Sequence, residues 1–238
     1  MPVHLLRGKI TNLRKTRESA SFFFTDSDQT AMGVIAVAAA AAGLGSQAVA
    51  VASASTSVDE EADYLEFEID GLDIRGWVWR SPFKEGDEVE VAVEKEGGHY
   101  VAFAMMRPSD RTIALYPHCS RGASAHIKNA VKWWFLGNTF VVLFSCVFFA
   151  IKNAIQGGGL YMVFLKHGLP FLAVFLYAFF GLMTVSMAKK WMPFVRLSER
   201  CFAAFGWKNP SSIDLVASTK KARKDSDPGE LGVMYFRY

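Results

Sequence analysis

Hydrophobic and polar positions follow different periods in different parts of the chain. Residues 3–14 alternate loosely, which predicts a strand with a bend at Gly8. From residue 63 the alternation is regular, and Leu65, Phe67 and Ile69 take every second place in the run DYLEFEIDG. The runs LDIRGWVW, DEVEVAVEKEGG and HYVAFAMM repeat this pattern with glycine turns between them. Four or five short strands in succession predict a small antiparallel β-barrel of OB type.

Two uncharged apolar runs follow, at residues 134–151 and 168–188. As helices they are about 27 and 31 Å long, which matches a hydrocarbon core of about 30 Å. The connector between them contains Gly157, Gly158 and Gly159, which we interpret as a hinge. The pattern therefore predicts an antiparallel transmembrane hairpin, and the fold class is an α+β membrane protein.

Aromatic and basic residues bracket this hairpin. Trp133 and Trp134 open the first run, and Lys189, Lys190 and Trp191 follow the second. Such residues anchor a helix at the membrane interface. Seven basic residues flank the hairpin and two lie in its connector, which predicts that both ends are cytoplasmic.

An Ala/Gly-rich segment at residues 30–57 carries no charge from residue 30 to residue 55. It is long enough to span a bilayer, but Ala and Gly give little drive for insertion. A single span would place the basic residues before it and the strands after it on opposite sides of the membrane. We therefore predict a helical hairpin or re-entrant segment, with a true span as the alternative.

Each predicted membrane helix carries a stripe of small or polar residues. The stripes comprise Asn138, Thr139 and Ser145 in the first helix and Tyr177, Gly181 and Thr184 in the second. Polar side chains inside a membrane turn toward protein or water. Two interpretations stay open: the stripes hold the hairpin together, or they line a pore formed by several copies.

The net charge of +3 conceals a strong partition along the chain. Residues 59–117 have 6 basic and 15 acidic side chains, whereas residues 118–238 have 15 and 5. No Asp or Glu occurs between Arg111 and Ser198, which is typical of membrane spans. The acidic β module argues against nucleic acid as a partner, because phosphate contacts supply most nucleic-acid affinity.

Catalytic motifs are absent from the sequence. His118 and Cys119 are adjacent, and adjacent side chains rarely face one substrate, so we interpret them as part of a turn. The three cysteines lie far apart, and this spacing argues against a disulfide framework or a zinc site. We expect no enzymatic activity, no cofactor and no metal. The N-terminus lacks the apolar region of a Sec signal peptide.

These patterns divide the chain into five segments. The tail predicts an amphipathic helix that ends near Gly206, followed by an aromatic end, GVMYFRY, that adds a strand to the β module. The predicted segments are an N-terminal arm (1–29) that could pair with the β module, the Ala/Gly-rich segment (30–57), the acidic β module (58–117), the basic turn and hairpin (118–191), and the tail (192–238).

The stretch AMMRPSDRTIALYPHCSRG at residues 104–122, followed by the hairpin, resembles a family of type VI secretion system effectors. The ending GELGVMYFRY is similar to the ending of those proteins. The resemblance covers most of the chain in layout. It implies a bacterial protein that a contractile secretion apparatus or carrier delivers into a neighbouring cell, where it acts on the inner membrane. A dedicated immunity protein would protect the producer.

We therefore expect an antibacterial effector that inserts its hairpin, forms a homo-oligomer in the lipid bilayer and leaks ions or depolarises the membrane. The alternative is a resident bacterial inner-membrane protein whose hairpin anchors a cytoplasmic OB-like scaffold or docking module. A plain anchor has no need of the Ala/Gly-rich segment, which favours the first function.

Overall fold

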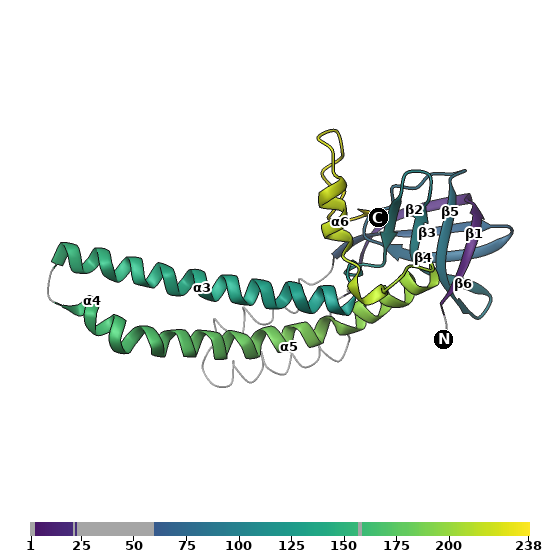
Figure 1. Ribbon diagram of the computed structural model, residues 1–238. Coiled ribbons are helices and arrows are strands. Elements are labelled where there is room, and N and C mark those ends of the chain that lie inside the picture. Colours follow the sequence, from purple (N-terminus) through teal and green to yellow (C-terminus); the bar gives the residue numbers. More distant parts are fainter. Residues whose placement is uncertain (1–2, 21, 23–59, 157–158) are drawn as a thin grey trace, which may run out of the picture. The chain divides into compact units, whose positions relative to one another are not determined.

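The computed structural model describes residues 3–20, 22, 60–156 and 159–238 (Figure 1). The Ala/Gly-rich segment 30–57 lies outside these residues, so its predicted hairpin stays a prediction. The chain forms two compact units. One comprises residues 1–119 and 215–238, and the other comprises residues 120–214.

Among the described residues, the first unit is built on an eight-stranded mixed sheet. Six strands follow the order β1-β5-β6-β4-β3-β2, and β7 and β8 extend from β6. The N-terminal arm supplies β1 and β2, the two strands at the ends of this order. The strands are β1 (His4–Lys9), β2 (Thr11–Ala20), β3 (Glu60–Ile69), β4 (Leu72–Val78), β5 (Glu88–Glu96), β6 (His99–Arg107), β7 (Thr112–Leu115) and β8 (Phe236–Arg237).

This sheet differs from the predicted antiparallel barrel in two respects. Strands β4 and β6 run parallel, and among the described residues no pairing joins β1 to β2 to close the sheet. The parallel pair depends on a close approach, because a Cβ at Gly76 would lie within 3 Å of the Ala102 side chain and closer still to its carbonyl oxygen. Periodicity finds strands, but it does not specify which strand pairs with which, and that is why the sequence missed the parallel pairing.

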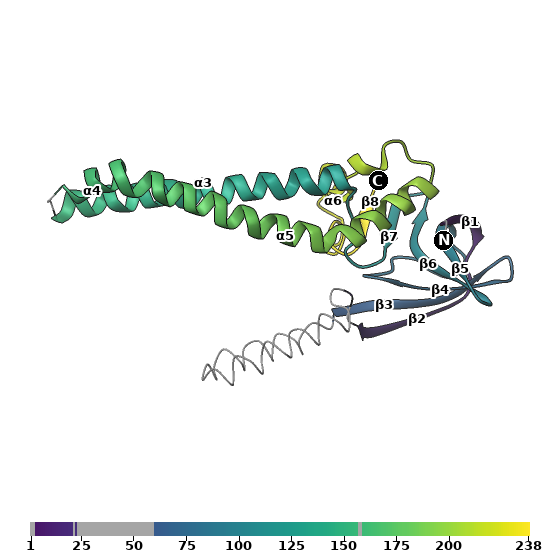
Figure 2. The same ribbon diagram turned by 90° about the horizontal axis from the view of Figure 1, so that it is seen from below.

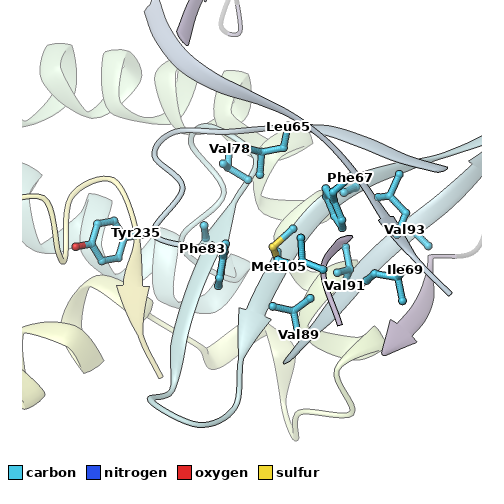
Figure 3. Close-up of a cluster of buried hydrophobic side chains, with 14 of the residues drawn as sticks. Leu65, Phe67, Ile69, Val78, Phe83, Val89, Val91, Val93, Met105 and Tyr235 are labelled. Carbon is cyan, nitrogen blue, oxygen red and sulfur yellow. The ribbon is translucent and has the colours of Figure 1, made fainter. Parts of the chain in front are cut away.

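The core of this unit lies on the apolar faces of the strands (Figure 3). In β3, Leu65, Phe67 and Ile69 are each at most 2% exposed, as the alternation predicts. They pack with side chains from β4, β5 and β6, including Val78, Val91 and Met105. One face of the sheet is therefore a continuous hydrophobic cluster.

The C-terminal segment belongs to this sheet unit. Strand β8 pairs antiparallel with β7, which is the strand addition that the aromatic ending predicts. Helix α6 (Leu215–Ala222) precedes it, and the buried Thr219 hydroxyl accepts a hydrogen bond from the Arg237 backbone N–H at 2.8 Å. The tail is thus fixed by backbone pairing as well as by its aromatic side chains.

The second unit consists mainly of two long antiparallel helices that lie side by side (Figures 1 and 2). It contains α3 (Ala123–Gln156), α4 (Leu160–Val163), the π-helical turn η1 (Phe164–Gly168), α5 (Leu169–Ala204) and the 3-10 turn η2 (Pro210–Ser212). The helices extend well beyond the predicted spans 134–151 and 168–188. A charged residue ends an apolar run, but Lys is a good helix former and does not end the helix.

The predicted hinge is described only in part. Gly157 and Gly158 lie outside the described residues, and Gly159 has a φ of +68°, a conformation that favours glycine. The helix resumes at Leu160.

The predicted amphipathic helix after residue 192 is not separate. Helix α5 continues through Pro193 to Ala204, so the predicted boundary at residue 192 falls inside it. It ends where predicted, because Gly206 has a φ of +72° and its N–H donates to the Ala203 carbonyl, while the Trp207 N–H donates to the Phe202 carbonyl. This is the Schellman arrangement that terminates helices.

Candidate functional site in the helical hairpin

The two long helices expose apolar side chains over most of their length. The stretches Ala123–Ile155 and Phe164–Ala204 each contain an apolar window of 18 residues, with mean hydropathies of 2.0 and 2.1, and both helices are long and apolar enough to cross a membrane. Only 6% of each apolar window is buried. Phe140 and Phe171 are 69% and 74% exposed, and Leu182 is 76% exposed. Exposed apolar surface of this extent marks an interaction with a membrane or another apolar partner.

Hydrogen bonds cross between the helices at the level of Tyr177. The hydroxyl groups of Thr139 and Tyr177 lie 2.7 Å apart, and the Trp134 indole N–H donates to the Tyr177 carbonyl at 3.3 Å. The rings of Trp134 and Tyr177 meet edge to face at 5.3 Å. Gly181 faces the same indole, and a Cβ there would lie in ordinary van der Waals contact with it, 3.4 Å from its nitrogen. These residues hold α3 against α5.

The remaining stripe residues bond within their own helices. Asn138 is 6% exposed and donates from Nδ2 to the Trp134 carbonyl at 2.6 Å. The hydroxyl groups of Ser145 and Thr184 donate to the carbonyls of Val141 and Phe180, each at 2.8 Å. The structure therefore brings Thr139, Tyr177 and Gly181 together with Trp134, and it leaves Ser145 outside that contact.

The predicted interface anchors do not form one group. Trp133 is 63% exposed, and Lys189 and Lys190 are also exposed. Trp134 instead faces α5 and is a packing residue. Trp191 is half-buried, with its ring 5.8 Å from that of Phe194.

The base of the hairpin is closed by the second half of the YPHCSRG turn. The Ala123 N–H at the start of α3 donates to the Glu199 carboxylate of α5 at 2.8 Å, which satisfies a free helix N–H with a favourable charge. Arg121 pairs with Asp214 at 3.1 Å, and the Gly122 N–H donates to the Ile213 carbonyl. A Cβ at Gly122 would overlap the Pro210 carbonyl, so only glycine fits there.

The first half of the turn packs into the sheet unit. His118 has a φ of +67°, and its Nε2 lies 2.7 Å from a Glu60 carboxylate oxygen. Its ring meets Trp79 at 4.9 Å, and Cys119 is 2% exposed. The turn thus joins two sets of structural contacts. Within residues 3–20, 22, 60–156 and 159–238, no group of three His, Cys, Asp or Glu side chains could hold a metal ion.

A groove of about 550 Å³ lies between α3 and α5, and sequence reasoning missed it. Residues that line it include His126, Trp133, Gly137 and Asn138 from α3 and Thr184 and Trp191 from α5. Its α3 positions His126, Ala130, Trp133, Gly137 and Val141 recur every three or four residues, and this spacing could have indicated one shared helix face.

Comparisons with family models, curated proteins and solved structures found no match to this chain.

Proposed function

We propose that the protein is a membrane-inserting antibacterial effector. The α3–α5 hairpin enters the inner membrane of a target bacterium and depolarises it or opens an ion-conducting path. The observation that supports this proposal is the exposed apolar surface of both helices. Only 6% of the apolar window in each helix is buried. Water is a poor solvent for such a surface, and a bilayer is its natural environment.

Under this proposal the sheet unit remains in water. We also propose that this unit is OB-like. An oligomer in the membrane would be needed for a conducting path, because two helices enclose no channel. The secretion apparatus or its carrier would deliver the chain, and an immunity protein would protect the producer. The resemblance of residues 104–122 and of the C-terminus to type VI effectors supports this part.

A specific observation favours a second function. Thr139 and Tyr177 bond to each other, and Ser145 and Thr184 bond to carbonyls of their own helices. Polar groups already satisfied inside the hairpin suit a simple anchor. The second candidate is therefore a resident inner-membrane protein that tethers the sheet unit as a scaffold or docking module.

Inducible expression directed to the periplasm tests the first function. Membrane potential and the entry of a large dye are recorded together. We expect loss of potential without dye entry, because a small ion path excludes the dye. Polarised, growing cells that accumulate the membrane-inserted protein would overturn the effector proposal and support the scaffold.

Two variants show whether insertion causes the effect. Phe140→Arg places a charge at a 69% exposed position in α3, at a cost of about 3 kcal/mol for insertion. It should abolish depolarisation. The matched control is Leu72→Arg, which also replaces an exposed apolar residue with arginine, but in β4, and should leave depolarisation intact. Equal activity of both variants would show that insertion of the hairpin is not the cause.

A further inference from the structure

Exposed lysines bound the apolar part of the hairpin at both of its ends. In α3, Lys132 and Lys152 are 20 residues apart, which corresponds to about 30 Å of helix. Lys166 in η1 and Lys189 in α5 are 23 residues apart, which corresponds to about 35 Å. No Lys, Arg, Asp or Glu lies between the members of either pair. A hydrocarbon core of about 30 Å therefore fits between the two levels of lysine.

Two of these lysines belong to the tip of the hairpin, which comprises residues 152–156 and 159–167. The rings of Phe149 in α3 and Phe164 in η1 stack with their centroids 4.0 Å apart, so the two helices are in contact at this end. Lys152 and Lys166 follow these rings within three residues along the chain, and both are exposed. The tip therefore carries two positive charges at one level of the hairpin.

The hairpin itself does not neutralise this charge. Its two long helices contain no acidic residue before Glu199, which lies at the base and accepts from the Ala123 N–H. A hairpin that spans the bilayer carries its tip to the far side, whereas Lys132 and Lys189 stay on the side of entry. Insertion thus moves two positive charges across the membrane, and its free energy varies in proportion to the membrane potential.

We propose that the membrane potential drives insertion of the hairpin by acting on Lys152 and Lys166. The cytoplasm of an energised cell is electrically negative, so the potential pulls a positive tip inward from the periplasm. Energised membranes are then entered preferentially, and depolarisation by the first copies slows the entry of later ones. The inference rests on the proposed insertion of the hairpin and adds its driving force.

This route fixes the orientation of the hairpin. A chain that enters from the periplasm keeps its basic base on the periplasmic side. That orientation is the reverse of the one that the basic flanks predict for insertion from the cytoplasm.

Vesicles with a controlled potential test the inference. The full-length protein is added to potassium-loaded phosphatidylcholine vesicles that contain valinomycin, because the potassium gradient then sets the potential. An impermeant thiol reagent is trapped inside, and Ile155→Cys, at a 78% exposed position of the tip, reports the arrival of the tip. Labelling of the chain without this cysteine is subtracted. A tenfold gradient with a negative interior should raise the ratio of inserted to surface-bound chain about 100-fold, tenfold for each charge moved.

Variants identify the charges on which the potential acts. Lys152→Gln with Lys166→Gln should abolish the response to the gradient, and either substitution alone should leave a response of about tenfold. The matched control, Lys189→Gln with Lys190→Gln, removes two charges at the base and should keep the 100-fold response. All chains carry His167→Gln, so that the lysines are the charged side chains of the tip.

The outcomes separate this inference from the proposed function. A chain that is not labelled at any gradient does not cross the bilayer, which contradicts the proposed function. A chain that is labelled equally at all gradients inserts, but it overturns the potential as the driving force. The inference is also overturned if the response persists without the two tip lysines, or if it disappears when Lys189 and Lys190 are replaced.

Discussion

Asp63 shows how a single buried carboxylate is stabilised in the sheet unit. Its side chain is 1% exposed, and it pairs with Arg17 at 2.9 Å and Lys15 at 3.2 Å. The Ser81 N–H donates to it at 2.8 Å. Burial alone would raise the pKa of Asp63, but the hydrogen bonds from Arg17, Ser81 and Lys15 outweigh burial and hold this pKa below its usual value.

The lowered pKa predicts a pH dependence. Asp63 contributes stability above its unfolded pKa of about 3.9, and this contribution is lost as the pH falls through the lower folded pKa. Asp63→Asn should cost about 3 kcal/mol at pH 7, because it leaves two cations without their buried partner. It should also flatten the fall in stability below about pH 4. Hydrogen exchange of β3 in the full-length protein measures both effects.

The control for this prediction contacts the same arginine from the surface. Glu61 is 70% exposed and lies 3.4 Å from Arg17. Glu61→Gln should cost less than about 1 kcal/mol, because an exposed ion pair is screened by water. Equal costs for the two variants would contradict the special role of Asp63.

At the scale of elements, the hairpin depends on contacts between α3 and α5 that are specific despite the apolar surroundings. Apolar side chains pack as well against lipid as against protein, so helix association in a membrane relies on close packing and hydrogen bonds. The Thr139–Tyr177 bond and the contact of Gly181 with Trp134 supply both. The stripes seen in the sequence thus include the contact surface of the hairpin.

A double-mutant cycle tests this contact. Thr139→Val and Tyr177→Phe should each weaken the hairpin and show a coupling energy of about 0.6 kcal/mol, the mean for such bonds in a membrane. Unfolding of the full-length protein in mixed micelles measures it. Thr184→Val serves as the control, since its hydroxyl bonds to the Phe180 carbonyl of its own helix and should show no coupling with Tyr177→Phe.

At the scale of the whole molecule, charge separates the two units. The β-strand region at residues 59–117 is acidic, whereas residues 120–214 carry ten basic and two acidic side chains. An anionic membrane surface attracts each nearby basic residue by about 1 kcal/mol. The helical unit is therefore attracted to such a surface, and the sheet region is repelled from it.

This separation of charge predicts that membrane binding depends on salt concentration. Binding of the full-length protein to anionic vesicles should weaken strongly between low and high salt, because screening shortens the reach of the charges. Binding to neutral vesicles should change little. Lys189→Gln with Lys190→Gln should reduce the salt dependence, and Lys220→Gln with Lys221→Gln in α6 should leave it unchanged. Co-sedimentation measures the bound fraction, and identical salt curves for the two pairs would refute the prediction.

Local pattern was enough to locate strands β3 to β6 and the two helices of the hairpin, but it did not separate β1 from β2 and it missed β7. Leu65, Phe67 and Ile69 alternate in sequence and are all buried, because a strand presents successive side chains to opposite faces. The apolar runs became long helices for a similar reason, since their length and composition act within one segment. The predicted boundary at residue 192 falls inside a helix, because α5 continues through Pro193 to Ala204.

By itself, the sequence determined the periodicities, the two apolar helices, the helix end at Gly206 and the partition of charge, since each depends on residues close together in the chain. Only the tertiary structure decided the parallel pairing of β4 with β6, the capping of α3 by Glu199 and the groove beside His126. These features join residues far apart in sequence. Their contacts depend on packing geometry, which a one-dimensional pattern does not contain.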